Sequence, residues 1–388
     1  MINDYDVVIV GTGSAGCFAA LNLSDRQKIL MICKTEPEES DSFLAQGGIC
    51  VLRNQEDFDA FFEDTMKAGH YDNNKEAVTI MINSSREVIT DLINFGVDFE
   101  HKGNEYLFTR EGAHTSSRIM YHKDRTGYEI TSTLLELCKK QDNIDIRPDT
   151  LMTDLIIEDD ACHGIQAQSK EGDELWFFAE HVILATGGVG GLFENSTNFR
   201  HLTGDAIAIA QRNGIDVKNV DRVQIHPTSL YDEKPDRRFL ISESVRGEGA
   251  ILLDKNLERF TNELLPRDLL TAEIKKQMEK DGTKHVWLDM RTLEEFYITE
   301  RFQSFYESCL EHGIDITKDL VPVVPAQHYY MGGIASDMHG RTSLQGLYAV
   351  GETSDNGVHG KNRLASNSLL EGLVFAKRAA ADIDGIEE

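Results

Sequence analysis

A glycine-rich hexapeptide near the start of the chain has the residue spacing that binds a dinucleotide. Gly11-Thr12-Gly13-Ser14-Ala15-Gly16 follows a continuous apolar run over residues 6–10 and leads into a helical pattern. In this arrangement the first glycine permits a tight turn, the second lets the backbone approach a pyrophosphate, and the third allows the helix to pack against the strand. Unpaired N–H groups at the helix N-terminus then face the phosphates. We therefore expect these six residues to hold a nucleotide cofactor.

Three further features indicate which dinucleotide is bound. The apolar run over 29–33 ends in Cys33-Lys34, without the acidic residue that usually holds a ribose hydroxyl, so Lys34 either contacts the adenosine moiety or is a solvated surface lysine. The turn Thr186-Gly187-Gly188 and the carboxylate of Glu352 each follow another predicted strand. A carboxylate at that position can bind ribitol hydroxyls, and an extended flavin nucleotide touches several strand ends. The sequence therefore favours FAD over NAD.

The elements that must position these motifs alternate between strands and helices. Continuous apolar runs predict buried parallel strands at 6–10, 29–33, 181–185 and 347–350. Helical patterns cover 14–23, 58–68, 75–95, 127–141, 204–213, 266–280, 293–309 and 363–380. Residues 110–125 are polar and rich in histidine, which is typical of a functional loop. We predict an α/β fold in which a Rossmann-like FAD-binding domain (1–220 and 330–388) is interrupted by an α+β capping domain (221–329).

Composition excludes several classes of function. The 388 residues include 39 Lys and Arg against 66 Asp and Glu, a formal net charge of −27 that would repel nucleic acids and anionic membranes. No apolar run approaches the length of a membrane-spanning helix, and the N-terminus has no pattern of a secretory signal. The six cysteines lack the spacing of zinc or iron–sulfur ligands, so we expect no metal and a reduced, cytoplasmic setting.

A series of motifs then points to a family. They are Ser42-Phe43-Leu44-Ala45-Gln46-Gly47-Gly48-Ile49, His226-Pro227-Thr228, Arg246-Gly247-Glu248-Gly249-Ala250, Pro266-Arg267-Asp268, His328-Tyr329-Tyr330-Met331-Gly332-Gly333 and Asn362-Arg363-Leu364-Ala365-Ser366-Asn367-Ser368-Leu369-Leu370-Glu371. In this order they resemble the flavoprotein family of succinate dehydrogenase, fumarate reductase and L-aspartate oxidase, over nearly the whole chain. The resemblance implies that FAD is contacted by Ser42, Phe43, Leu44, Ala45, Gln46, Gly47, Gly48, Asp205, Ser368 and Leu369, in addition to the residues above.

Within that family, residues 109–114 resemble the signature of the L-aspartate oxidase branch. The resemblance implies that Glu111 orients the amino group of the substrate. Members that bind FAD covalently have a histidine five residues before the glutamine of the first motif, whereas this chain has Asp41, which implies noncovalent FAD. Ser242 stands where the most similar family pattern has threonine. The branch usually continues into a C-terminal helical domain, so this sequence is expected to be either naturally short or a truncated version.

The implied reaction is oxidation of L-aspartate to iminoaspartate, with hydride passing to the flavin. It would be the first step of NAD biosynthesis through quinolinate, with oxygen or fumarate as the electron acceptor and quinolinate synthase as the downstream partner. Arg363 and His328 would bind one carboxylate, and His226 with Ser242 the other. Arg267 matches the proton-transfer arginine of the family. Because arginine is a poor base, it would need a relay to Glu243 or Arg246.

Other interpretations stay open at this point. One alternative is a soluble fumarate reductase or succinate dehydrogenase flavoprotein; Glu111 and Asp41 weigh against succinate dehydrogenase. Another is a non-catalytic flavin-binding protein. Taken singly, each histidine could be structural, Arg267 could pair with Asp268, and Glu111 could be a solvated loop carboxylate. If the site is real, positive charge should gather at Arg246, Arg267, Arg363 and the site histidines, as an electropositive pocket within an acidic surface.

Overall fold

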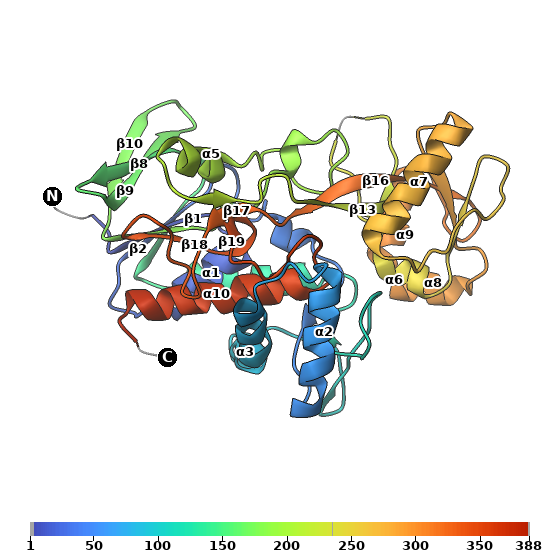
Figure 1. Cartoon of the computed structure of the whole chain (residues 1–388), viewed down its shortest axis with the longest axis horizontal. Coiled ribbons are helices and arrows are strands. Elements are labelled where there is room, and N and C mark those ends of the chain that lie inside the picture. Colours follow the sequence, from blue (N-terminus) through green and yellow to red (C-terminus); the bar gives the residue numbers. More distant parts are fainter. Residues whose placement is uncertain (1–3, 235, 387–388) are drawn as a thin grey trace.

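A five-stranded parallel sheet forms the centre of the molecule in the computed structural model, which describes residues 4–234 and 236–386 (Figure 1). Its strands lie in the order β18-β11-β1-β2-β7. Their bounds are Leu347–Ala349, His181–Leu184, Val7–Val10, Ile29–Ile32 and Ile144–Arg147. Four of these strands are apolar runs because both of their faces are covered, so successive side chains are buried. The edge strand β7 differs, because its Asp145 and Arg147 are exposed. The four predicted strands are confirmed within one or two residues.

The two faces of this sheet contact different elements. Val7 and Ile9 face a core built with five helices, and Val8 and Val10 face a core built with the β8–β10 sheet and one helix. The first group is α1 (Ser14–Asn22), α2 (Phe58–Ala68), α3 (Lys75–Asn94), α4 (Thr126–Cys138) and α10 (Asn367–Ile383). The second is β8 (Thr150–Glu158), β9 (Ala161–Ser169), β10 (Glu174–Phe178) and α5 (Asp205–Arg212).

A separate hydrophobic core lies to the right in Figure 1, around an antiparallel sheet of order β13-β16-β15-β14. The strands are Val223–Leu230, Val321–Tyr330, Val286–Asp289 and Ile251–Leu253. The helices are α6 (Glu243–Gly247), α7 (Arg267–Asp281), α8 (Glu295–Arg301) and α9 (Gln303–Glu311). The architecture confirms a Rossmann-like domain interrupted by an α+β insertion. The limits at 220/221 and 329/330 remain a proposal, and β16 continues to residue 330.

Short elements connect these layers. The small sheets are β3 (Ile49–Cys50) with β6 (Ile119–Met120), β4 (His101–Lys102) with β5 (Glu105–Tyr106), and β12 (Val217–Lys218), β17 (Gly333–Ala335) and β19 (Ser354–Asp355). Single 3₁₀ turns are η1 (Asp41–Leu44), η2 (Gln55–Asp57), η3 (Gly190–Leu192) and η4 (Gly351–Thr353).

Two predicted helices differ from the observed ones. The helix expected over 293–309 is two helices, because Phe302 leaves helical geometry with φ −121° and ψ 44°. The last helix was expected from 363 but begins at Asn367, because Ser366 adopts a left-handed conformation with φ +62°. Arg363 therefore lies in the loop before α10, and its charge is not placed at a helix start. No helix within the described ranges is long and apolar enough to cross a membrane.

The buried face of α10 should contribute strongly to stability. Leu373 is fully buried in the core beneath the parallel sheet, whereas Leu310 on α9 is 46% exposed. We expect Leu373→Ala to lower the free energy of unfolding by about 2–5 kcal/mol, because it removes buried methyl groups and leaves a cavity. Leu310→Ala should change it by less than about 0.5 kcal/mol. Urea unfolding followed by circular dichroism measures both, and equal losses would contradict this assignment of the core.

Candidate active site

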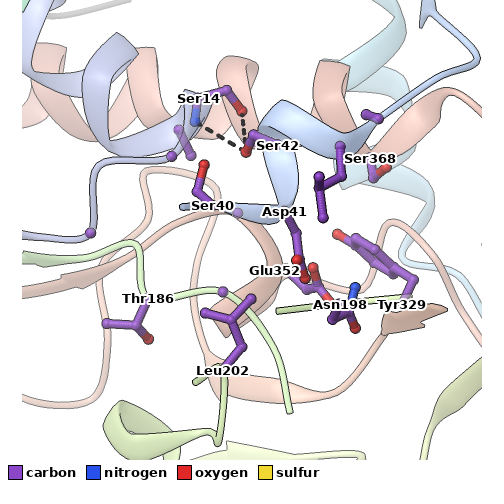
Figure 2. A pocket seen from close by; sticks show the side chains of 18 of the residues that line it. Ser14, Ser40, Asp41, Ser42, Thr186, Asn198, Leu202, Tyr329, Glu352 and Ser368 are labelled. Atoms are coloured by element: carbon purple, nitrogen blue, oxygen red, sulfur yellow. Dashed lines mark hydrogen bonds between the residues drawn. The ribbon is translucent and has the colours of Figure 1, made fainter. Parts of the chain in front are cut away.

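One cavity brings together the glycine loop after β1, the turn after β11, the loop before α10 and the start of α7. Figure 2 shows the part of this cavity around Ser42, Thr186 and Glu352. Its walls include Gly11, Gly13, Thr186, Glu352, Arg363 and Arg267. These residues follow the carboxyl ends of the parallel strands or come from the inserted segment. Ligands of open α/β sheets bind at this edge.

The glycine loop is shaped for close approach of a ligand to the backbone. Gly11 has φ +116°, and a Cβ there would lie 2.2 Å from the carbonyl oxygen of Ala185. A Cβ on Gly16 would lie 2.2 Å from the Gly11 oxygen, so Gly16 allows α1 to pack against the loop. Gly13 precedes α1 without a side-chain cap of its own, and Ser14 N donates to Ser42 Oγ at 3.1 Å (Figure 2). The first turn of α1 lines the cavity at Ser14 and Ala15, which is where a pyrophosphate would bind.

The lysine that follows β2 is paired with an acidic residue of another element. Lys34 forms an ion pair with Asp205, the first residue of α5, and Asp205 also accepts a hydrogen bond from Thr203 Oγ1 at 2.7 Å. Both members of the pair line the cavity. The interpretation of Lys34 as a solvated surface lysine is therefore wrong.

Unpaired buried polar atoms face the middle of the cavity and fit a ligand rich in hydroxyl, carbonyl and N–H groups. Ser40 Oγ, Asp41 Oδ2 and Asn198 Oδ1 are buried, line the cavity and have no hydrogen-bond partner among the described residues. Asp41 Oδ1 accepts from Phe199 N at 2.9 Å, and Glu352 Oε1 accepts from Tyr330 N at 2.9 Å. Figure 2 shows Asp41, Glu352 and Asn198 close together. Such a wall suits the ribitol and ring edges of FAD, which would pair these atoms.

Burial changes the ionisation of the two carboxyl groups. Desolvation raises the pKa of Asp41 to about 7, and it raises the pKa of Glu352 to about 8 with a further contribution from the charge of Asp41. A Cβ on Gly188 would lie 2.4 Å from Glu352 Oε1, so this glycine makes room for the carboxyl group.

Most predicted cofactor residues line this cavity. They are Gly11, Thr12, Gly13, Ser14, Ala15, Lys34, Ser42, Leu44, Ala45, Gln46, Gly47, Gly48, Thr186, Gly187, Asp205, Glu352, Ser368 and Leu369. The exceptions are Gly16, Gly188 and Phe43. The two glycines make room for neighbouring groups, the Gly11 carbonyl and the Glu352 carboxyl group, and Phe43 packs edge-on against Tyr128. Sequence reasoning missed wall residues that belong to no motif, including Ser40, Asn198 and Thr197.

Two guanidinium groups converge on one side-chain oxygen at the other part of the cavity. Arg267 Nη1 and Arg363 Nη2 donate to Gln224 Oε1 at 3.0 and 3.1 Å. Gln224 Nε2 donates to Asn362 Oδ1 and to the Arg363 carbonyl, both at 2.8 Å, which fixes the orientation of the amide. Sequence reasoning missed Gln224, although it lies two residues before His226 on the same strand. Burial, together with the charge of Arg267, lowers the pKa of Arg363 to about 10.

Arg267 pairs with a carboxylate of the inserted segment. Its Nε donates to Glu243 Oε2 at 2.8 Å, and both side chains are largely buried. Burial alone would raise the pKa of Glu243, but the charges of Arg267 and Arg246 lower it below its usual value. Asp268 instead lies 3.4 Å from His70 Nε2, so the pairing of Arg267 with Asp268 is wrong.

The two site histidines face each other with ring centroids 5.5 Å apart. His226 Nε2 lies 2.9 Å from the Ile241 carbonyl, so it carries the proton, and Nδ1 has no partner among the described side chains. Thr197 Oγ1 lies 2.9 Å from His328 Nδ1. Burial and the neighbouring arginine charges lower the pKa of both imidazoles well below the usual value. The positive charge of the pocket thus comes from arginines, and the expectation that the histidines add to it in the free protein is wrong.

Glu111 is a buried member of the cavity wall, which excludes a solvated loop carboxylate. Ser366 Oγ donates to its Oε2 at 2.6 Å, and Glu111 is 7% exposed. A Cβ on Gly47 would lie 2.4 Å from Glu111 Oε1, and one on Gly112 would lie 1.8 Å from Glu243 Oε1. Glycines at these positions therefore let the loop at 111–112 contact both the cofactor side of the cavity and Glu243.

Ser242 and Arg246 differ in their access to the cavity. Ser242 lines it and caps α6 by accepting from Ser244 N at 3.3 Å. Arg246 lies outside the lining; its Nη1 donates to the Glu263 carbonyl oxygen, while Nε and Nη2 are buried and unpaired within the described structure. Arg246 thus acts on the site through its charge. The geometry supports a dicarboxylate ligand that also carries a positively charged group, which can pair with Glu111.

Comparisons with known proteins agree with this geometry. The model of the FAD binding domain family matches residues 6–369. An L-aspartate oxidase of Clostridium perfringens is 50% identical over 380 residues, covering 98% of this chain and 86% of that protein. One of Clostridium acetobutylicum is 49% identical, covering 98% and 88%. Among solved structures, an E. coli quinol fumarate reductase is similar with a TM-score of 0.92 and 29% identity, over 98% of this chain and 70% of that one.

The raised pKa of Glu352 predicts how stability depends on pH. Below about pH 4.5 the folded and unfolded chains both hold this proton. As the pH rises to about 8, the unfolded chain releases the proton while the folded chain keeps it, so the FAD-free protein loses stability across this window.

Glu352→Gln should make the stability of the FAD-free protein depend less steeply on pH, because the amide does not titrate. Thermal unfolding of the FAD-free protein at a series of pH values measures the slope. Glu105→Gln, at an exposed position, serves as the control and should keep the wild-type slope. An unchanged slope in Glu352→Gln would contradict the assignment.

Proposed function

Because the chain belongs to the L-aspartate oxidase family of FAD-binding flavoproteins, we propose that it oxidises L-aspartate to iminoaspartate, the first step of NAD biosynthesis through quinolinate. The observation that carries this proposal is the pairing of opposite charges in one cavity. The buried carboxylate of Glu111 can receive an ammonium group, and the guanidinium groups of Arg267 and Arg363 can receive carboxylates. Hydrogen bonds to charged groups of this kind contribute about 1.5–3 kcal/mol each.

One substrate carboxylate is proposed to bind Arg363 and His328. Arg363 is held on one side by Gln224 and on the other by Ser368 Oγ, to which its Nη1 donates at 3.1 Å. Its guanidinium also lies over the ring of Tyr329, 4.7 Å from the centroid. These contacts leave Arg363 Nε as a buried donor without a partner in the described structure. A carboxylate would supply that partner.

The other carboxylate is proposed to bind Ser242 and His226. Because the proton of neutral His226 points to the Ile241 carbonyl, its Nδ1 can only accept a hydrogen bond. Binding of a carboxylate at Nδ1 therefore requires His226 to take up a proton, which the negative charge of the substrate favours. In the absence of substrate, the nearby arginines and burial keep the imidazole neutral.

Bound FAD supplies the acceptor for the hydride that leaves C2 of the substrate. Formation of the imine also requires a proton to leave the substrate. We assign the handling of that proton to Arg267 together with Glu243, because arginine alone is a poor base and Glu243 is the ionised group hydrogen-bonded to it. Arg246 is assigned a supporting role through its charge, since it does not line the cavity.

The remaining assignments rest on the family and on single residues. FAD is proposed to be noncovalent, because Asp41 stands where covalently linked members have histidine, and its carboxyl group faces the cavity. Oxygen or fumarate is the proposed electron acceptor, and quinolinate synthase the proposed consumer of the unstable imine. A cytoplasmic location is proposed on the strength of six unpaired cysteines.

A second candidate is a fumarate reductase or succinate dehydrogenase activity, which the similarity to E. coli quinol fumarate reductase favours. The two candidates differ in what must face Glu111. Succinate has no ammonium group and would leave this buried carboxylate without its charged partner, and an unpaired buried polar group discriminates strongly between substrates.

Anaerobic mixing tests the proposal directly. We expect L-aspartate to bleach the flavin absorbance of the purified holoenzyme, because it alone places its C2 hydride and its ammonium group correctly. D-aspartate and succinate serve as the controls and should leave the flavin oxidised. Bleaching by succinate at a comparable rate would favour the second candidate, and no bleaching by any of the three would contradict both.

Removal of the Glu111 charge should separate the two activities. Glu111→Gln keeps an oxygen for the Ser366 hydroxyl but loses the negative charge, so we expect kcat/KM for L-aspartate to fall by about 10- to 100-fold. Fumarate reduction by the chemically reduced enzyme should change by less than about threefold, because fumarate carries no ammonium group. Steady-state kinetics of both reactions measures the difference, and equal losses would rule out the assigned role of Glu111.

A further inference from the structure

A fully buried arginine lies behind the loop that carries Glu111. Arg118 donates from Nε and Nη2 to the two oxygens of Asp57 at 3.1 and 3.0 Å, and from Nη1 to Asp64 Oδ2 at 2.6 Å. Its guanidinium lies over the ring of Phe61, 4.9 Å from the centroid. The two aspartates belong to η2 and α2, so Arg118 fastens the end of the loop to that helical segment.

The same network holds the loop residues before Arg118. Asp64 Oδ2 accepts hydrogen bonds from the backbone N and the hydroxyl of Thr115, at 2.8 and 2.9 Å. Ser116 Oγ donates to Asp57 Oδ1 at 2.7 Å. The contacts thus fix the two consecutive residues Thr115 and Ser116 and also Arg118 itself. A buried ion-pair cluster of this kind is stable only when its partners are all in place.

His114 connects Arg118 to Ala365 in the loop before α10. Its Nδ1 lies 3.1 Å from Arg118 Nη1, which can only donate, so Nδ1 is the acceptor and Nε2 carries the proton. Nε2 lies 3.0 Å from the carbonyl oxygen of Ala365 and donates to it. Burial lowers the pKa of His114, which keeps the imidazole neutral and this tautomer in place.

Ala365 lies between two groups of the site. Arg363 precedes it by two residues, and Ser366, the next residue, donates to Glu111 Oε2. The contacts therefore close a ring: Glu111 to Ser366, Ser366 to Ala365 along the chain, Ala365 to His114, and His114 back to Glu111 along the loop. Ala113 and Ser366 in this ring both have left-handed φ values, +66° and +62°. Such conformations persist in non-glycine residues only where surrounding contacts hold them.

We propose that His114, oriented by Arg118, is a positioning residue that fixes Glu111 relative to Arg363 and so selects amino dicarboxylates over plain dicarboxylates. The proposal rests on the function proposed above for this site. Arg363 and Glu111 come from segments more than 250 residues apart, and the hydrogen bond from His114 to Ala365 joins those segments. Without it, the carboxylate that receives the ammonium group and the guanidinium that receives the substrate carboxylate lose their fixed spacing.

Two substitutions of His114 separate its two hydrogen bonds. An asparagine oxygen lies where Nδ1 lies and keeps the contact with Arg118, but it loses the donor to Ala365. A glutamine amide nitrogen lies where Nε2 lies and keeps the donor to Ala365. Tyr5→Phe is the matched control, because it removes a partly buried hydrogen bond to Asp145 outside the cavity.

The readout is the binding selectivity of the oxidised holoenzyme. Perturbation of the flavin spectrum gives Kd for succinate, and the concentration dependence of anaerobic bleaching gives the apparent Kd for L-aspartate. We expect His114→Asn to raise the apparent Kd for L-aspartate about 10-fold, with less than about a threefold change for succinate. His114→Gln and Tyr5→Phe should both remain within about threefold of wild type for both ligands.

Four outcomes would overturn the proposal. They are equal weakening of both ligands in His114→Asn, no weakening of either, a loss of selectivity in His114→Gln as large as in His114→Asn, and the same loss in Tyr5→Phe. If His114→Asn fails to fold, Ser366→Ala removes the last contact of the ring and should give the same selective loss. Failure of the proposed function is distinguishable, because it would appear as an unbleached wild-type enzyme.

Discussion

Convergence of two guanidinium groups on the side-chain oxygen of Gln224 is the constraint on which the rest of the cavity depends. Like charges held this close in a buried site repel each other and are costly to desolvate, so each needs an anionic or polar partner. Glu243 supplies one for Arg267, and Gln224 is itself held by Asn362 and by the Arg363 carbonyl. Burial, together with the same charges, lowers the pKa of both site histidines and keeps them neutral. A dianionic ligand relieves the repulsion, so the site is prepared for negative charge although the protein as a whole is strongly acidic.

Glycines give this charged cluster its shape. Side chains at Gly47 and Gly112 would collide with the carboxyl groups of Glu111 and Glu243, and one at Gly188 would collide with Glu352. Each of these glycines therefore lets a carboxyl group approach the backbone of a distant segment.

The sequence alone was sufficient for much of the fold and for part of the site. Four strands of the parallel sheet are covered on both faces, so their apolar runs could be recognised without tertiary information, whereas the edge strand β7 has no such run. The glycine fingerprint and the ordered motifs predicted most of the cavity wall. Gln224 and His114 could not be assigned in this way, because their partners Arg363 and Ala365 lie far along the chain. The break at Phe302 and the late start of α10 were missed because local geometry at single residues overrode a helical pattern.

The ion pair between Lys34 and Asp205 bears on how a sequence pattern for dinucleotide binding is interpreted. A pattern that requires an acidic residue directly after β2 is not met by this chain, because Cys33 and Lys34 follow that strand. The cavity nonetheless contains a carboxylate beside this lysine, because Asp205, the first residue of α5, pairs with Lys34 and both residues line the cavity. An acidic residue that is absent from a sequence pattern can therefore still have a counterpart in the cavity, because a residue 171 positions away along the chain places a carboxylate beside Lys34.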